Sequence, residues 1–259
     1  MKLALFGGVY SNAYALESAL ADARARGVDG LFCLGDIGAF GPDPDRVYPL
    51  LRGAGVRCLQ GNYDHSLAAG LADCQCGYTD PRDNHFARLS YAYTSGHTSA
   101  GNKAWLAGLP PLIRLREEGL SLLLCHGSPR RTNEFLWEST TPDGFLERLM
   151  DEQGADVIAA THTGLKWQRR LPSGRLFVNV GVLGRPENDG RPNTWYALLH
   201  LEGGRARAEF VPVRYDTAAL ARDMLREGLP EEFVQTALTG WWTSCLEVLP
   251  HKERARGRF

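Results

Sequence analysis

The sequence predicts an α/β protein in which two mixed β-sheets are flanked by helices. Short, continuous apolar runs recur along the chain, and the early runs are separated by segments with helical periodicity. After residue 172, strand-like runs follow one another with no helical segment between them. Continuous apolar runs are typical of strands buried on both faces, and their alternation with helices predicts βαβ units with right-handed crossovers.

Six apolar runs predict the buried strands, and each stops at glycine or at a polar residue. They are LALF (3–6), GLFCLG (30–35), VRCLQG (56–61), LSLLLCH (120–126), DVIAATH (156–162) and RLFVNVG (175–181). Between the first two runs, residues 13–25 have helical periodicity, and Asn12 is placed to cap that helix. Residues 43–55 predict a second helix, for which Gly53 is a stop signal.

The C-terminal part of the chain predicts a hairpin followed by helices. The runs at 194–202 and 205–215 flank Gly203 and Gly204, a pair that favours a tight turn. Helical periodicity returns at about residue 216, and the last nine residues, 251–259, are expected to form a solvated tail.

Residues from about 65 to 101 interrupt the alternation of strands and helices. We interpret them as an insertion over one edge of the sheets, of the kind that shapes a binding cleft. With this insertion, residues 1–259 are expected to form a single domain.

Composition excludes some classes of protein. The formal charge of −1 argues against a nucleic-acid or membrane-surface protein that works by bulk electrostatics. No apolar run approaches the roughly 20 residues that a membrane helix needs. The first ten residues contain an early glycine pair and predict a first strand rather than a signal peptide.

The six cysteines are scattered along the chain. Cys33, Cys58 and Cys125 lie inside apolar runs, where a thiol behaves as a small hydrophobe. This usage favours a reducing cytoplasm over a disulfide framework. Cys74 and Cys76 are interpreted as packing within a loop; a metal clip or a redox pair is the alternative.

Four of the six runs end beside a residue that can bind a metal ion. These residues are Asp36, Asn62, His126 and His162. Because parallel strands place their carboxyl ends along one edge of a sheet, the four side chains are expected to converge there. One carboxylate, one amide oxygen and two imidazoles suit Mn²⁺, Fe²⁺ or Zn²⁺. Taken singly, each has another interpretation, as a hydrogen-bonded core histidine or as a turn or cap residue.

In this order, the motifs resemble those of the calcineurin-like metallophosphoesterases, and in detail those of one bacterial subfamily. The motifs are GD (35–36), GNYD (61–64), HGSP (126–129), THTG (161–164) and VNVGVLGRP (178–186). The resemblance covers the chain to about residue 215. It implies a four-layer α/β/β/α sandwich with a metal site at the sheet edge.

The resemblance also implies that one of two metal sites has been lost. In the family two ions share a bridging water that attacks phosphorus. Gly8, Tyr10 and Gly164 stand where the family has ligands to one ion, whereas the four ligands of the other ion are retained. One divalent ion is therefore expected. Tyr63 replaces a histidine that serves as the general acid in many members.

Two functions follow from the resemblance. The first is a single-metal phosphoesterase that hydrolyses a phosphate mono- or diester. Arg130 or Arg131 would hold the phosphate, and Arg185 is a further guanidinium near a motif. The second is an inactive relative that binds a phosphorylated ligand or a protein partner.

Tyr10 and Tyr63 would donate a hydrogen bond to the leaving oxygen or would fill the vacated space. A small phosphorylated compound is the expected partner, with neither nucleic acid nor membrane, and the oligomeric state is left open.

Overall fold

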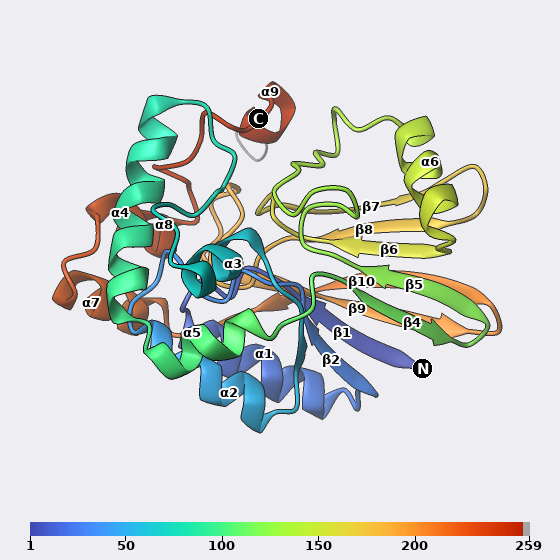
Figure 1. The fold of residues 1–259 in the computed structure, drawn as a ribbon, viewed down its shortest axis with the longest axis horizontal. Coiled ribbons are helices and arrows are strands. Elements are labelled where there is room, and N and C mark those ends of the chain that lie inside the picture. The colour runs from blue at the N-terminus through green and yellow to red at the C-terminus, as the bar shows by residue number, and fades with distance from the viewer. Residues whose placement is uncertain (256–259) are drawn as a thin grey trace.

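The computed structural model describes residues 1–255 as two five-stranded sheets that face each other, with helices outside them (Figure 1). Both sheets contain parallel and antiparallel neighbours. In Figure 1, α1 and α2 lie below β1 and β2, and α6 lies above β6 and β8. This arrangement confirms the predicted four-layer architecture of two mixed sheets flanked by helices.

The first sheet has the strand order β10-β9-β1-β2-β3. Its strands are β1 (Lys2–Phe6), β2 (Gly30–Cys33), β3 (Arg57–Cys58), β9 (Thr194–Glu202) and β10 (Arg205–Val213). The strands β1, β2 and β3 run parallel, as the βαβ pattern predicts. The antiparallel hairpin β9–β10 joins β1 on the other side and turns at Gly203 and Gly204.

The second sheet has the order β4-β5-β6-β8-β7. Its strands are β4 (Ile113–Glu117), β5 (Leu120–Leu124), β6 (Val157–Ala160), β7 (Lys166–Arg170) and β8 (Leu176–Val180). The central three run parallel. The two edge strands, β4 and β7, were not expected from the sequence. In each, exposed polar or charged residues interrupt the more buried ones, so neither has a continuous apolar run.

The helices match most of the segments with helical periodicity. They are α1 (Ala13–Ala25), α2 (Val47–Gly53), α3 (Asn62–Ala69), α4 (Pro81–His97), α5 (Ala100–Ala107), α6 (Asp143–Gln153), α7 (Thr217–Arg226), α8 (Glu231–Thr239) and α9 (His251–Ala255), with a 3-10 turn η1 (Pro44–Arg46) before α2. Asn12 caps α1 through the backbone N–H of Ala15, as predicted. The helices α3, α5 and α6 were not expected.

Alternate residues of each central strand serve different layers of the core. In β1, Leu5 packs between the two sheets, whereas Phe6 packs under the helices of the first sheet. In β6, Ala159 faces the other sheet, and Ile158 packs with Leu146 of α6. Burial on both faces explains why these strands read as unbroken apolar runs.

Two segments at the edges of the fold bear on earlier expectations. The predicted insertion at 65–101 contains α4, which packs through Phe86 and Tyr91 onto the core beside the first sheet. The predicted solvated tail is wrong for residues 251–255, because they form α9 and bury Glu253 against the backbone and hydroxyl of Ser139. Residues 256–259 lie outside the described residues.

None of the helices formed by residues 1–255 is long and apolar enough to cross a bilayer.

Leu5→Ala should lower the free energy of unfolding by about 2–5 kcal/mol, because it opens a cavity between the sheets. Leu225→Ala, at an exposed position of α7, should change it by less than about 0.5 kcal/mol. Denaturant unfolding of the two variants measures both values. Equal losses would contradict the assignment of the core.

Candidate metal centre

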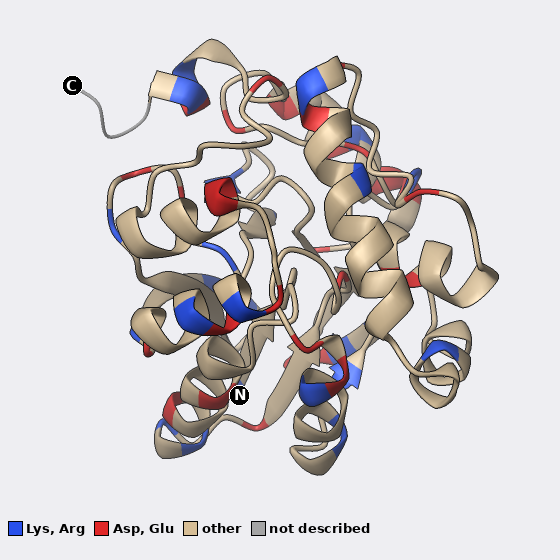
Figure 2. Cartoon of the chain, turned by 90° about the vertical axis from the view of Figure 1, so that its left-hand side faces the viewer, with Lys and Arg blue, Asp and Glu red and all other residues tan. Residues whose placement is uncertain are grey.

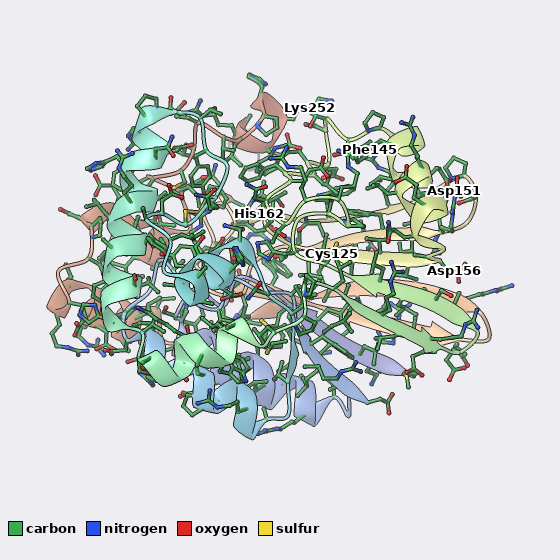
Figure 3. The ribbon with its side chains drawn as sticks, viewed as in Figure 1. Cys125, Phe145, Asp151, Asp156, His162 and Lys252 are labelled. Atoms are coloured by element: carbon green, nitrogen blue, oxygen red, sulfur yellow. A yellow bond between two sulfur atoms is a disulfide. The ribbon has the colours of Figure 1, made fainter. Side chains whose placement is uncertain are left out.

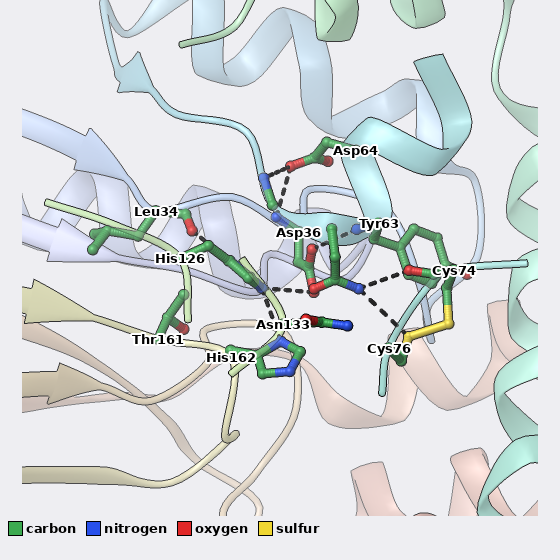
Figure 4. Close-up of polar contacts among 12 residues, drawn as sticks. Leu34, Asp36, Tyr63, Asp64, Cys74, Cys76, His126, Asn133, Thr161 and His162 are labelled. Carbon is green, nitrogen blue, oxygen red and sulfur yellow. Dashed lines mark hydrogen bonds and ion pairs between the residues drawn. A yellow bond between two sulfur atoms is a disulfide. The ribbon is translucent and has the colours of Figure 1, made fainter. Parts of the chain in front are cut away.

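Asp36, His126 and His162 form a buried cluster at the carboxyl ends of the parallel strands. They follow β2, β5 and β6, and one possible ligand atom from each lies within 4.8 Å of the others. The Nε2 atom of His126 is 3.2 Å from Oδ2 of Asp36 and 3.1 Å from Nδ1 of His162. The three side chains point toward one another (Figure 4), and His162 lies inside the molecule at the ends of the strands (Figure 3). The convergence predicted for these three residues is confirmed.

The ring of His126 is oriented by the other sheet. Its Nδ1 atom lies 2.7 Å from the carbonyl oxygen of Leu34, and a carbonyl can only accept a hydrogen bond. Nδ1–H therefore donates, and Nε2 is the atom that faces the cluster. This is the arrangement that prepares a histidine for metal binding.

A proton or a metal ion is needed between Nε2 of His126 and Asp36. Because Nδ1 of His126 carries the hydrogen, the lone pair on Nε2 would otherwise face the carboxylate oxygen at 3.2 Å and repel it. Burial lowers the pKa of His126, but the charge of Asp36 outweighs it, so the pKa is raised. Burial and the charge on His126 lower the pKa of His162 to about 3. Without a metal, a proton on His126 fills this role, and a metal ion would displace it.

The spacing of the cluster also suits a metal ion. Two ligands that lie about 2.1 Å from a common ion at a right angle are about 3.0 Å apart. The distances of 3.1 and 3.2 Å around Nε2 of His126 are close to this value. In addition, Asp36 and His162 both have positive φ, of 56° and 71°, a backbone conformation that is uncommon for residues other than glycine.

Asn62 lies next to the cluster with one polar atom unused. Its Nδ2 donates to the carbonyl of Cys74 at 2.8 Å, whereas its Oδ1 is buried and has no hydrogen-bond partner. Leaving a buried acceptor unpaired costs about 1–3 kcal/mol. A Cβ on the preceding Gly61 would stand 2.2 Å from Oδ1 of Asp36, so only glycine lets the two loops approach this closely. The residues present therefore fit a divalent ion held by the cluster, and the unpaired Oδ1 of Asn62, next to the Tyr63 N–H that binds Asp36, is a candidate fourth ligand.

Asp64, which was not singled out from the sequence, fixes the loop that carries Asp36. Its Oδ2 accepts from the backbone N–H groups of Asp36, at 2.7 Å, and of Gly61, at 2.9 Å. Its Oδ1 accepts from Ile37 at 3.0 Å. Burial and the charge of Asp36 raise the pKa of Asp64 to about 6. The sequence signal that could have identified Asp64 was its place in the GNYD motif (61–64).

Cys74 and Cys76 form a disulfide beside this site. The interpretation of the pair as thiols in loop packing is therefore wrong. Gln75 has a positive φ of 50°, and this backbone conformation turns the two cysteines toward each other. Cys33, Cys58, Cys125 and Cys245 are free and buried, and the first three are the cysteines that the apolar runs predict as core residues.

A cavity of about 50 Å³ opens beside the cluster. Asp36 and His162 line one part of it, and Arg185 lines another. Most of its remaining wall is aromatic, formed by Tyr10, Phe40, Tyr63, Tyr78, Phe86 and Phe233. We call it the aromatic cavity. It has room for an ion, a few waters or one small group.

Two of the three positions without ligands, Gly8 and Gly164, are closed by other side chains. A Cβ on Gly8, whose φ is +52°, would stand 2.4 Å from Val182. A Cβ on Gly164, whose φ is +80°, would stand 2.8 Å from the ring of Trp242 and 3.3 Å from Nη2 of Arg185. Neither position therefore has room for a ligand side chain, because an aliphatic group, an indole and a guanidinium lie against it.

The tyrosines predicted near the site line the aromatic cavity. The hydroxyl of Tyr63 lies 3.1 Å from Oγ of Ser90 and donates to Oγ1 of Thr94 at 3.3 Å, while its backbone N–H donates to Asp36. Burial raises the pKa of both Tyr63 and Tyr10 above the usual value. Their hydroxyls are therefore protonated at neutral pH, and their role in the reaction stays a prediction.

The two arginines after the HGSP motif lie at the surface. Arg130 pairs with Glu134 at 2.5 Å and lies over the ring of Phe145. Arg131 is exposed. Among residues 1–255, the lining of the aromatic cavity includes Arg185 and neither of these two arginines. Their assignment as phosphate-binding residues stays a prediction.

A family profile described as the calcineurin-like phosphoesterase superfamily domain matches residues 1–204. The chain belongs to this superfamily. The uncharacterised protein MJ0912 of Methanocaldococcus jannaschii is 24% identical over 243 residues, which cover 88% of this chain and 94% of that protein.

Two solved structures resemble this phosphoesterase-family chain. A metallophosphoesterase from Sphaerobacter thermophilus has a TM-score of 0.71 and 25% identity, and the match covers 93% of this chain and 99% of the other. The hypothetical protein PH1004 of Pyrococcus horikoshii has a TM-score of 0.75 with the same coverages, and at 18% identity it shows the fold alone.

The purified protein should contain about one divalent ion per chain, and His126→Ala should remove it, because Nε2 of His126 stands between the other ligands. His251→Ala, an exposed histidine in α9, should keep the metal. Elemental analysis of the two variants measures this. Two tightly bound ions in the unaltered protein would show that the missing-ligand assignment is wrong.

Asp64→Ala should lower the free energy of unfolding by about 3–5 kcal/mol and weaken metal binding, because three buried N–H groups lose their acceptor. Asp151→Ala, which removes an exposed ion pair on α6, should cost less than about 1 kcal/mol. Denaturant unfolding and a metal titration give the two readings. Unchanged metal affinity in Asp64→Ala would refute the positioning role.

Proposed function

We propose that this chain is a metal-dependent phosphoesterase that hydrolyses a phosphate mono- or diester with one divalent ion. The observation that carries the proposal is the buried cluster of Asp36, His126 and His162, whose ligand atoms face a common point. Membership of the superfamily and the likeness to a metallophosphoesterase structure support the same reaction class.

Asp36, Asn62, His126 and His162 would hold the ion. When bound, an ion such as Mn²⁺, Fe²⁺ or Zn²⁺ lowers the pKa of water and polarises a phosphoryl oxygen. The chain's own residues keep the ligands in place: Leu34 fixes the ring of His126, and Tyr63 binds Oδ1 of Asp36 through its N–H. Aromatic side chains around the cavity limit the access of bulk water.

Arg130 or Arg131 is the sequence-based candidate for binding the phosphate, and for Arg130 this requires the guanidinium to leave Glu134, with which it now pairs. A small phosphorylated compound is the proposed partner. The charge distribution supports this choice over nucleic acid, because acidic and basic residues are interspersed on the face seen in Figure 2. The cytoplasmic location is retained as part of the proposal, although the Cys74–Cys76 bridge does not favour it.

A second candidate function is an inactive relative that binds a phosphorylated ligand or a protein partner. The closure of the positions at Gly8 and Gly164 favours it, because neither position has room for a ligand to a second ion. In a two-metal site the second ion stabilises the opposite side of an in-line displacement. Its loss would lower the rate or abolish turnover.

With added Mn²⁺ or Zn²⁺, the protein should hydrolyse an aryl phosphate diester or monoester, and Asp36→Asn should lower the rate at least about 100-fold. Asp151→Asn in α6 is the matched control and should keep the full rate. Initial rates of nitrophenol release provide the measurement. If Asp36→Asn and the unaltered protein hydrolyse both esters equally fast, the activity does not come from this site.

A further inference from the structure

Arg185 is a buried guanidinium without an anionic partner. It is 7% exposed, and its Nε has no hydrogen-bond partner. The ion pairs formed within residues 1–255 do not include Arg185. Burying a charged group in this way is costly unless a partner of opposite charge pairs with it, so this guanidinium is ready to bind an anion.

Aromatic rings hold the guanidinium in place without using its donors. Its central carbon lies 3.6 Å from the ring centroid of Trp242 and within 6.0 Å of the centroids of Phe40 and Tyr10. Contacts of this kind stabilise a cation through the ring faces, whereas N–H groups in the guanidinium plane remain available. A polar neighbour, the Cys245 thiol, is a weak acceptor.

Trp242 is itself fixed to the loop that carries Arg185. Its Nε1–H donates to the carbonyl of Pro186 at 2.7 Å, and its backbone N–H donates to Oδ1 of Asn188 at 3.0 Å. The indole and the guanidinium are therefore one rigid unit. Such a unit can present the charge in a fixed direction at low entropic cost.

This unit stands where the family resemblance places a ligand to the missing ion. The Cβ of a side chain at position 164 would contact both the Trp242 ring and Nη2 of Arg185. Arg185 also lines the aromatic cavity together with Asp36 and His162. The oxygens of Asp36 are already engaged by His126 and by the N–H of Tyr63, so they do not neutralise the guanidinium at contact distance.

We propose that Arg185 binds the phosphoryl oxygens of a phosphate monoester in the aromatic cavity and supplies the positive charge of the missing ion. This inference rests on the proposed function, since it places the phosphate beside the metal held by Asp36, His126 and His162. A guanidinium pairs with phosphate through two parallel N–H groups. A terminal phosphate exposes three oxygens and carries up to two negative charges, more than a diester offers, so it gains more from a guanidinium.

The test is isothermal titration of the metal-loaded protein with inorganic phosphate. Arg185→Met should weaken phosphate binding about 10-fold or more, since charge-assisted hydrogen bonds are lost, while the metal content stays unchanged. Arg185→Lys should bind phosphate with intermediate affinity, because it keeps the charge but cannot donate two parallel N–H groups. Arg207→Met, an exposed arginine on β10, is the matched control. Unchanged affinity in Arg185→Met would overturn the proposal.

A second measurement does not depend on the folding of Arg185 variants. Phosphate should change the tryptophan emission of the metal-loaded protein, and Trp242→Phe should remove that change, because this indole lies on the guanidinium. Phosphate binding seen by calorimetry with no response from Trp242 would place the anion elsewhere and overturn the proposal.

The outcomes for Arg185 and for catalysis are separable. Tight phosphate binding through Arg185 without Asp36-dependent hydrolysis would support this inference and refute the catalytic proposal. Asp36-dependent hydrolysis with normal phosphate binding in Arg185→Met would do the reverse. A titration with dimethyl phosphate decides the substrate class: weaker binding than inorganic phosphate is expected, and equal binding would refute the monoester preference.

Discussion

The structure depends on one electrostatic constraint, namely that three electron-rich atoms share a dry space. Nε2 of His126 lies 3.2 Å from a carboxylate oxygen of Asp36 and 3.1 Å from Nδ1 of His162. The lone pair on Nε2 and the carboxylate repel each other unless a proton or a metal ion lies between them. A proton on His126 satisfies the pair with Asp36 but leaves Oδ1 of Asn62 unpaired. A divalent ion accounts for the oxygen of Asn62 as well, so the donor set as a whole favours a metal.

The fold creates this constraint by joining its two sheets at one edge. Asp36 comes from the first sheet, whereas both histidines come from the second. The hydrogen bond from His126 to the carbonyl of Leu34 spans the gap between the sheets directly at the cluster. Asp64 then ties the Asp36 loop to the start of α3, where Asn62 lies. The contacts that hold the two sheets together at this edge are consequently the contacts that position the ligands of the site.

Much of this arrangement is predictable from the sequence because it follows from parallel strands. Strands buried on both faces leave long apolar runs, and the residue after each run must reach the common edge; this locates Asp36, His126 and His162. The edge strands β4 and β7 lack that signal, since they are buried on one side at most. The Cys74–Cys76 bridge depends on the backbone angle of Gln75, which spacing alone does not reveal. Arg185 is visible as a residue near a motif, but its burial is not, because it depends on Trp242, which is 57 residues further along the chain.

The contact between Arg185 and Trp242 also bears on how a metal site can disappear. If ligand loss were simple decay, neutral side chains of suitable volume would be enough to close the space, as Val182 does beside Gly8. At Gly164 the space is instead taken by a cation and by the ring that supports it. A buried positive charge weakens the folded state unless a group of opposite charge pairs with it. A second ion would need protein ligands, whereas a guanidinium needs none. This is consistent with the absence of metal ligands at Gly8, Tyr10 and Gly164. If both proposals hold, the chemistry of this edge is that of one metal plus one fixed cation rather than half of a two-metal site.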